Sequence, residues 1–197
     1  MARKTALLTV GSTAFTPLVH SFLQPSVLIA LAFLGVDDVY AQVGTSTLPF
    51  EWKEGVQSAH GLRVEVVRFS SDIEERVGEV QLVISHAGAG SILSFLRPST
   101  SSGSPSTLQS TSSAPSASRR LILVPNSTLM DSHQSDLADE MSKKGWAIVC
   151  ERPEDLPVTL ELLANEAARK DGLEKPTYPE LDENKVQRIL DETLGYV

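Results

Sequence analysis

The sequence has a single cysteine, Cys150, so no disulfide can form within the chain. It also lacks the ~20 consecutive apolar residues of a membrane-spanning helix, because its most apolar stretch, 27–36, is only about half that length. The N-terminus has no long apolar run followed by small residues, which a signal peptide requires. These absences predict a chain that folds in a reducing compartment and reaches a membrane only through a partner or a surface.

Positive charge is scarce as well. Lys and Arg number 17 against 25 Asp and Glu, which gives a formal net charge of −8, and the sequence shows no run of basic residues. Since binding along a nucleic-acid backbone requires clustered Lys and Arg, we expect no nucleic-acid partner. Hydrophobic residues make up 41% of the 197 positions and charged residues 21%, a balance typical of a globular domain, and the length suits one nucleotide-binding domain rather than two.

Short apolar runs rich in β-branched residues alternate with segments of helical spacing along the chain. A first helical segment, 17–34, is interrupted at Pro25, and a short one follows Ser91. Asp131 or Ser132 caps another that ends at Gly145, and a further one runs from Pro157 to about 170. The predicted strands are 6–10, 39–43, 62–69, 80–85, 121–124 and 146–150. This alternation predicts an α/β fold, a Rossmann-like, mainly parallel sheet with helices on both faces.

Two segments have a different composition. Residues 98–118 are almost entirely Ser, Thr, Pro and Gly, which cannot bury enough apolar area to offset chain entropy, so we expect a disordered insertion inside a domain that spans 1–170. Residues 171–197 would form a polar linker and a C-terminal amphipathic helix. Its apolar stripe consists of Val186, Ile189, Leu190 and Leu194. Such a stripe packs on its own domain about twice as often as on a partner, and its distance from the core raises the weight of the partner alternative somewhat.

Ligands of open parallel sheets bind outside the carboxyl ends of the strands, where three loops of this chain should meet. These loops are Gly11-Ser12-Thr13, the segment from His86 to Ser91, and 126–134. Gly88 and Gly90 allow backbone amides to approach an anion at a helix start, where the helix dipole favours a diphosphate. The same glycines are compatible with a tight turn and close helix packing alone, and a histidine at a strand end is often structural.

Polar side chains of the third loop, Asn126, His133 and Gln134, would suit the hydroxyls of a sugar, although helix capping explains them equally well. The histidines have no metal-ligand spacing, and no Ser-His-Asp arrangement can be defended. The sequence contains neither Gly-x-Gly-x-x-Gly nor a Walker lysine. We therefore expect no metal and no cofactor, and we assign no catalytic base.

Several of these segments resemble one family. LLTVGSTAF (7–15), VISHAGAGSIL (83–93), VPN (124–126) and LMDSHQ (129–134) are similar, in this order, to the soluble subunit of the eukaryotic two-subunit N-acetylglucosaminyltransferase, which has a glycosyltransferase family 28 C-terminal domain. The chain departs from the family pattern at 43–46, where relatives commonly show Gly-Arg-Gly, at Thr16, where Asp is usual, and in the 98–118 insertion.

The resemblance implies the donor-binding, C-terminal half of a type-B glycosyltransferase (GT-B). Carried over to this chain, the residues that border the interdomain cleft are Gly11, Ser12 and Thr13. Those that approach the diphosphate are His86, Ala87, Gly88, Ala89, Gly90 and Ser91, and those that face the donor are Asn126, Met130, His133 and Gln134. The family's C-terminal helix is associated with partner binding, which favours a docking role for Val186, Ile189, Leu190 and Leu194.

The resemblance also implies a function. The chain would be a subunit of a heteromeric enzyme that transfers GlcNAc from UDP-GlcNAc to N-acetylglucosaminyl diphosphodolichol, the second step of lipid-linked oligosaccharide assembly for N-glycosylation. A membrane-anchored acceptor-binding subunit would recruit it from the cytosol to the cytosolic face of the endoplasmic reticulum, and the resulting heterodimer would be the active form. The alternative is a non-catalytic nucleotide-sugar-binding regulatory or scaffold subunit.

Overall fold

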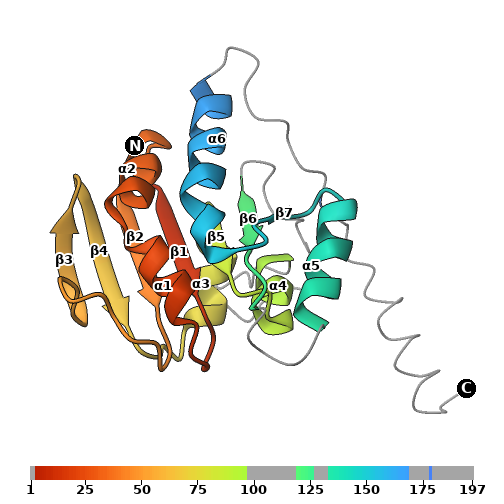
Figure 1. The fold of residues 1–197 in the computed structure, drawn as a ribbon, viewed down its shortest axis with the longest axis horizontal. Helices are drawn as coiled ribbons and strands as arrows, with labels where there is room; N and C mark the ends of the chain where they lie inside the picture. The colour runs from red at the N-terminus through yellow and green to blue at the C-terminus, as the bar shows by residue number, and fades with distance from the viewer. Residues whose placement is uncertain (1–2, 97–118, 127–132, 169–177, 179–197) are drawn as a thin grey trace, which may run out of the picture.

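The computed structural model describes residues 3–96, 119–126, 133–168 and Tyr178. Within these residues, seven strands form one sheet in the order β3-β4-β2-β1-β5-β6-β7 (Figure 1). Strand β3 pairs antiparallel with β4, and all other neighbouring pairs are parallel. The strands are β1 (Thr5–Thr9), β2 (Asp38–Gln42), β3 (Gly55–Ala59), β4 (Leu62–Val67), β5 (Leu82–Ser85), β6 (Arg120–Leu123) and β7 (Ile148–Val149).

Helices cover both faces of this sheet. Helices α1, α2 and α6 pack on one face, and α3, α4 and α5 pack on the other (Figure 1). The predicted α/β fold with a mainly parallel sheet between helices is therefore confirmed. The helices are α1 (Thr16–Phe22), α2 (Pro25–Phe33), α3 (Ile73–Glu79), α4 (Ala89–Leu96), α5 (His133–Lys143) and α6 (Leu156–Ala168).

Successive side chains along the strands belong alternately to two hydrophobic cores, one on each face of the sheet. In β1, Ala6 and Leu8 belong to the core beneath α1, α2 and α6, whereas Leu7 belongs to the core beneath α3, α4 and α5. In β5, Ile84 and Val83 are divided between the same two cores. Since successive side chains of a strand point to opposite faces, a strand that is apolar throughout must be covered on both sides.

The order of the parallel strands determines where a ligand-binding crevice lies in this sheet. From β1 the chain proceeds to β2 and β4 on one side of the sheet, and then returns to β5 on the other side of β1. The loop after β1 leads to α1 on one face, while the loop after β5 leads to α4 on the opposite face. These two loops diverge, so the carboxyl ends of β1 and β5 border a crevice where ligands bind in open α/β sheets.

Two observed elements, β3 and α3, are not predicted by the sequence patterns. β3 is a short, largely exposed edge strand without apolar alternation, and it is held by a two-residue hairpin in which His60 and Gly61 both have positive φ, at 51° and 82°. Helix α3 buries only Val77 and Gly78, too few positions for a helical period to be recognised. The predicted strands 62–69, 80–85 and 146–150 also extend a few residues beyond β4, β5 and β7.

The most apolar stretch, 27–36, is expected from the sequence to be a buried helix. Its residues 27–33 form most of α2, but Ile29 and Phe33 of this helix are exposed. Val27, Leu28 and Leu31 are buried in the core beneath α6. Among the described helices, none is by itself long and apolar enough to span a membrane, and α1 and α2 reach that length and composition only together, as a pair bent by 55°.

The side chain of Arg119 connects α3 and α4, the two helices beside the crevice. Its guanidinium is buried and donates hydrogen bonds to the carbonyl oxygens of Val80 at 2.9 Å and Phe95 at 3.1 Å, and also to that of Val77. Carbonyls at the C-terminal ends of α3 and α4 favour a cation. Burial lowers the pKa of Arg119 to about 10, so the side chain stays charged at neutral pH.

Tyr178, in the predicted linker, packs against the same group. Its hydroxyl donates a hydrogen bond to the Arg119 carbonyl at 2.8 Å, and its ring meets the Phe95 ring edge-on, with centroids 5.5 Å apart. The rest of the linker, the 98–118 insertion and the stripe of Val186, Ile189, Leu190 and Leu194 lie outside the described residues, and the division at residue 170 stays a prediction.

Candidate functional site

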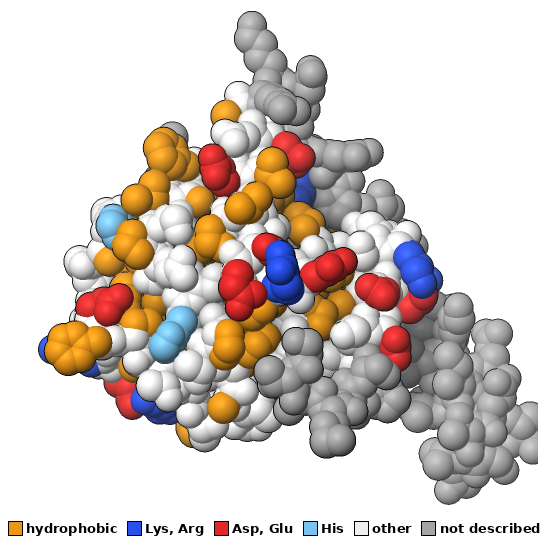
Figure 2. Space-filling view, in the orientation of Figure 1, with side chains coloured by type: hydrophobic (Ala, Val, Ile, Leu, Met, Phe, Trp, Pro, Cys, Tyr) orange, Lys and Arg blue, Asp and Glu red, His pale blue; other side chains and the backbone are white. Residues whose placement is uncertain are grey.

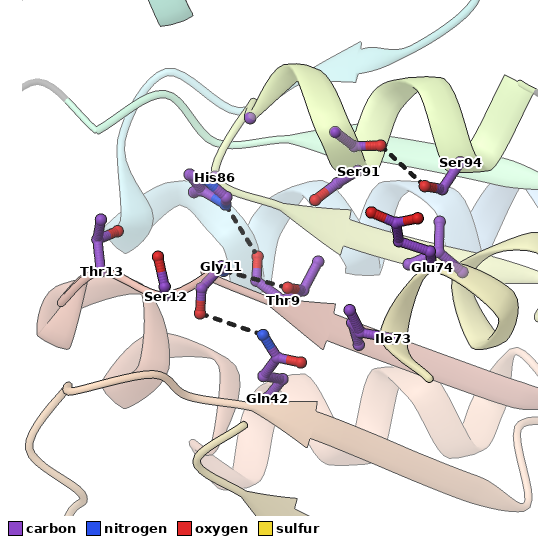
Figure 3. Close-up of a pocket in the computed structure, with 13 residues that line it drawn as sticks. Thr9, Gly11, Ser12, Thr13, Gln42, Ile73, Glu74, His86, Ser91 and Ser94 are labelled. Carbon is purple, nitrogen blue, oxygen red and sulfur yellow. Dashed lines mark hydrogen bonds between the residues drawn. The ribbon is translucent and has the colours of Figure 1, made fainter. Parts of the chain in front are cut away.

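A cavity of about 320 Å³ opens at the carboxyl ends of β1 and β5 (Figure 3). Its walls come from the loops after β1 and β5, the end of β2, and helices α3 and α4. The side chains around it are small and mostly hydroxylic or apolar. The lining residues are Thr9, Gly11, Ser12, Thr13, Gln42, Ile73, Glu74, Val77, His86, Gly88, Gly90, Ser91 and Ser94.

Gly11 begins the loop after β1 with φ at +66°, a left-handed conformation that favours glycine. Its N–H donates to Thr9 Oγ1 at 3.1 Å, and its carbonyl accepts a hydrogen bond from Gln42 Nε2 at 3.1 Å. Since a carbonyl oxygen only accepts, this bond fixes the orientation of the Gln42 amide. Gln42 Oε1 is buried and has no partner among the described residues. The last residues of β1 and β2 therefore hold the Gly11 loop in place.

The loop after β2 packs directly against the Gly11 loop. Gly44 has φ at +54°, and a Cβ added there would lie 2.3 Å from the Thr13 carbonyl oxygen, so no side chain fits. Ser46 Oγ accepts a hydrogen bond from the Phe15 N–H at 2.9 Å. Within 43–46, where the sequence departs from the family pattern, a glycine and a hydroxyl thus join the two loops.

His86 follows β5, and its ring is enclosed by two glycines. Its Nδ1 lies 3.3 Å from the Thr9 carbonyl oxygen, an acceptor, so Nδ1 carries the hydrogen and Nε2 is left as an acceptor. A Cβ added at Gly88 would lie 2.5 Å from Nε2, and one added at Gly11 would lie 3.0 Å from Cε1. Burial lowers the pKa of His86, and the hydrogen bond with Thr9 opposes this only in part, so the ring is neutral at pH 7.

The turn between β5 and α4 is tight. Ala87 is buried with φ at +64°, a conformation that costs a residue with a side chain on the order of 1 kcal/mol. It lets α4 begin at Ala89, beside the cavity that Gly88, Gly90 and Ser91 line. The first amides of a helix have no intrahelical acceptor and carry the positive end of the dipole, so this wall suits an anion such as a diphosphate.

The structure brings the predicted residues of the first two loops into one cavity, namely Gly11, Ser12, Thr13, His86, Gly88, Gly90 and Ser91. Ala87 and Ala89 shape the turn without lining the cavity. Asn126 and Gln134 are joined by a hydrogen bond, in which the Asn126 N–H donates to Gln134 Oε1 at 3.1 Å, and neither is among the described residues that line this cavity. His133 begins α5, and Met130 lies outside the described residues.

Other residues of the cavity are absent from the sequence-based prediction: Thr9, Gln42, Ile73, Glu74, Val77 and Ser94. A signal existed for Thr9 and Gln42, because each is a polar residue at the carboxyl end of a strand whose central residues are mainly apolar. Ser94 follows Ser91 at helical spacing. Nothing pointed to Ile73, Glu74 and Val77, since α3 itself was not recognised.

Within the described ranges, no group of three or more His, Cys, Asp or Glu side chains is placed to hold a metal ion. Cys150 is buried, and burial raises the pKa of its thiol. The described residues of the cavity offer backbone amides, hydroxyls, the side-chain amide of Gln42, one neutral imidazole and one carboxylate.

Comparisons with known proteins agree with this geometry. Residues 5–100 match the model of the glycosyltransferase family 28 C-terminal domain. The UDP-N-acetylglucosamine transferase subunit ALG13 of Cryptococcus neoformans is 31% identical over 219 aligned residues, which cover 98% of this chain and 97% of that protein. Among solved structures, the NMR structure of ALG13 is similar with a TM-score of 0.56 and 25% identity, over 97% of this chain and 96% of the other. Acinetobacter baumannii MurG shares the fold, with a TM-score of 0.52 and 19% identity over 86% of this chain and 42% of its own.

Proposed function

Because this chain belongs to the family of UDP-N-acetylglucosamine transferase ALG13 subunits, we propose that it is the donor-binding subunit of a GlcNAc transferase and takes UDP-GlcNAc into the cavity between β1 and β5. The observation that carries the proposal is the position of this cavity. It lies where the strand order reverses, and the start of α4 forms one of its walls.

The cavity suggests how the donor binds. The diphosphate would lie against the first amides of α4, beside Gly88, Gly90 and Ser91, because these N–H groups and the helix dipole favour negative charge. His86 Nε2, an acceptor in the neutral ring, would take a hydrogen bond from a hydroxyl of the donor. The hydroxyls of Ser12 and Thr13 lie on the other loop of the cavity and can donate to the donor as well.

In the reaction, a hydroxyl oxygen of the acceptor would form a bond to the anomeric carbon of GlcNAc while the bond from that carbon to the UDP oxygen breaks. UDP leaves with the electron pair, and the proton of the acceptor hydroxyl goes to a base. Negative charge grows on the departing UDP, so donors that are already oriented at the start of α4 would lower the barrier. Attack from the side opposite UDP gives inversion at the anomeric carbon.

The acceptor that we propose is N-acetylglucosaminyl diphosphodolichol, and the partner is a membrane-anchored, acceptor-binding subunit at the cytosolic face of the endoplasmic reticulum. Two findings support a partner. The relatives are named as subunits of a transferase, and the similarity to MurG covers only 42% of the MurG chain. In the proposed enzyme, the partner would supply the GT-B half that holds the acceptor. The stripe of Val186, Ile189, Leu190 and Leu194 is the proposed docking element for that half.

The test is transfer of labelled GlcNAc from UDP-GlcNAc to N-acetylglucosaminyl diphosphodolichol by the full chain, alone and co-expressed with the membrane-anchored partner. We expect product only from the pair. Gly90→Trp should abolish transfer, because a Cβ added at Gly90 meets no atom within 4 Å and the indole beyond it would occupy the cavity that Gly90 lines. Leu93→Trp is the matched control, since Leu93 lies on the same helix, is 48% exposed and does not line the cavity.

The alternative, a non-catalytic nucleotide-sugar-binding regulatory or scaffold subunit, gives a different result. An intact complex of the two chains that binds UDP-GlcNAc and forms no product would support it. Full transfer by the Gly90→Trp variant would instead show that the donor does not occupy this cavity.

A further inference from the structure

A second cavity, of about 570 Å³, lies between α2 and α6, on the face of the sheet opposite to α4. It shares no described lining residue with the cavity between β1 and β5. Its lining follows α6 from Pro157 to Ala168, which is about 16 Å or three helical turns. Figure 2 shows hydrophobic side chains over these two helices and acidic side chains beside them. We call this cavity the α2–α6 groove.

Exposed hydrophobic side chains are concentrated at this groove. Of the eight large hydrophobic side chains that are exposed among the described residues, four lie on the two helices: Ile29, Phe33, Val158 and Leu162. Each helix supplies two of them at a spacing of four residues, so each pair lies on one side of its helix. Single exposed apolar side chains are ordinary, whereas a cluster of them marks a binding surface.

Helix α2 has the composition of a helix that is covered on all sides. Between Pro25 and Phe33 its only polar side chain is that of Ser26. Helices that are apolar on every side are normally buried on every side. One side of α2 is indeed buried in the core, but Ile29 is exposed and Phe33 is 81% exposed. The composition of α2 therefore indicates that a further surface covers the groove.

Charge indicates what kind of surface this is. Glu161 is the only charged side chain among the described residues of the groove, and it forms no ion pair or hydrogen bond with another described residue. It would repel an anionic membrane surface. In a twofold dimer of this chain, the same patch of both copies meets, so two Glu161 side chains would share the interface. A partner with Lys or Arg within an apolar surface complements the groove instead.

We propose that the α2–α6 groove binds an amphipathic helix of the membrane-anchored partner, with its apolar stripe against Ile29, Phe33 and Val158 and a Lys or Arg beside Glu161. Amphipathic helices bind grooves through apolar side chains that recur at helical spacing, and three turns suffice for such a contact. Segments beside a membrane span are rich in Lys and Arg on the cytosolic side, so a partner anchored there supplies the required charge. This inference rests on the proposed function, because it takes the partner to be membrane-anchored.

Site-specific cross-linking identifies the occupant of the groove. The full chain carries a photoreactive amino acid at position 26, where Ser26 is exposed and lines the groove, and it is co-expressed with the partner. After irradiation of the purified complex, peptide mass spectrometry locates the cross-link. We expect it on a cytosolic partner segment that has an apolar stripe and a Lys or Arg. The same amino acid at position 56 is the control, because Val56 is exposed on β3 and should not reach that segment.

Affinity measurements on the same complex test the contacts. Glu161→Lys should weaken binding about tenfold, because it replaces an attraction by a repulsion. Glu166→Lys is the matched control, since Glu166 is exposed on the same helix and does not line the groove. Phe33→Ser should weaken binding at least about tenfold by removing buried apolar area. Reversing the charge of the cross-linked partner residue should restore the affinity of Glu161→Lys. Thermal unfolding of each variant verifies the fold.

Other outcomes overturn the inference. A cross-link from position 26 to lipid, to a second copy of this chain or to another segment of the chain itself would assign the groove to that occupant. Equal weakening by Glu161→Lys and Glu166→Lys would show an effect of net charge alone. If no variant weakens the complex and the pair still transfers GlcNAc, the groove does not hold the partner, although the proposed function stands. If wild type neither binds the partner nor transfers GlcNAc in its presence, the proposed function is wrong as well.

Discussion

Gly88→Ala tests the packing at the centre of the site with a single methyl group. The added Cβ would lie 2.5 Å from His86 Nε2 and 2.7 Å from Cε1, whereas ordinary van der Waals contact begins at about 3.4 Å. Gly88 does not have a positive φ, so alanine is compatible with its backbone, and the effect must come from this overlap. The His86 ring has little room to withdraw, because Gly11 lies against its Cε1.

The expected cost follows from these contacts. Overpacking a closely packed site costs about 1–3 kcal/mol, and rotation of the ring would also break the bond from Nδ1 to the Thr9 carbonyl, which is worth about 1 kcal/mol. We expect Gly88→Ala to lower the free energy of unfolding by about 2 kcal/mol. For a chain of this size, that loss corresponds to a decrease in Tm of about 4–8 °C.

The assay is urea unfolding, which measures the free energy of unfolding of wild type, Gly88→Ala, His86→Ala and the double variant. Once the ring is absent, the methyl group at position 88 has space, so Gly88→Ala should cost less than about 0.5 kcal/mol in that background. Gly90→Ala is the control, because its Cβ meets nothing within 4 Å and alanine favours a helix by about 0.5–1 kcal/mol. Equal costs of Gly88→Ala in the two backgrounds would refute the argument that the methyl group collides with His86.

Further predictions concern titration and the anchor at Arg119. Burial lowers the folded-state pKa of His86 below its ordinary value of 6.5, so the unfolded chain binds more protons; stability should fall as the pH drops below about 6.5, and His86→Gln should reduce that decrease in urea titrations between about pH 5 and 8. An identical pH profile in the variant would contradict the assignment. Arg119→Met should lower the free energy of unfolding by roughly 3 kcal/mol, because carbonyls at the ends of α3 and α4 lose a charged donor; a change within about 0.5 kcal/mol would disprove this role. Tyr178→Phe should cost about 1 kcal/mol by losing one hydrogen bond, and unaltered thermal stability would show that the bond does not form in solution.

The candidate loops followed from the sequence because the relevant signals are local. A run of apolar residues that ends at a glycine identifies a buried strand and its loop without knowledge of the rest of the chain. The run that ends at Gly11 has this form, the run 80–85 leads through His86 and Ala87 to Gly88, and both loops line the cavity. Glu74 gave no such signal, since it lies on a short helix with one buried apolar side chain. Gln42 gave a weaker one, as a polar residue at the carboxyl end of a strand.

The sequence by itself determined the alternation of strands and helices, the two-sided burial of the sheet and the loops that follow its strands, because these depend on periodicity and turn residues within short segments. Only the tertiary structure decided that β1 and β5 are neighbours, that Gln42 holds the Gly11 loop, and that α3 brings Glu74 to the start of α4. These relations join residues far apart in the chain. They depend on the order of strands in the sheet, which no local pattern encodes.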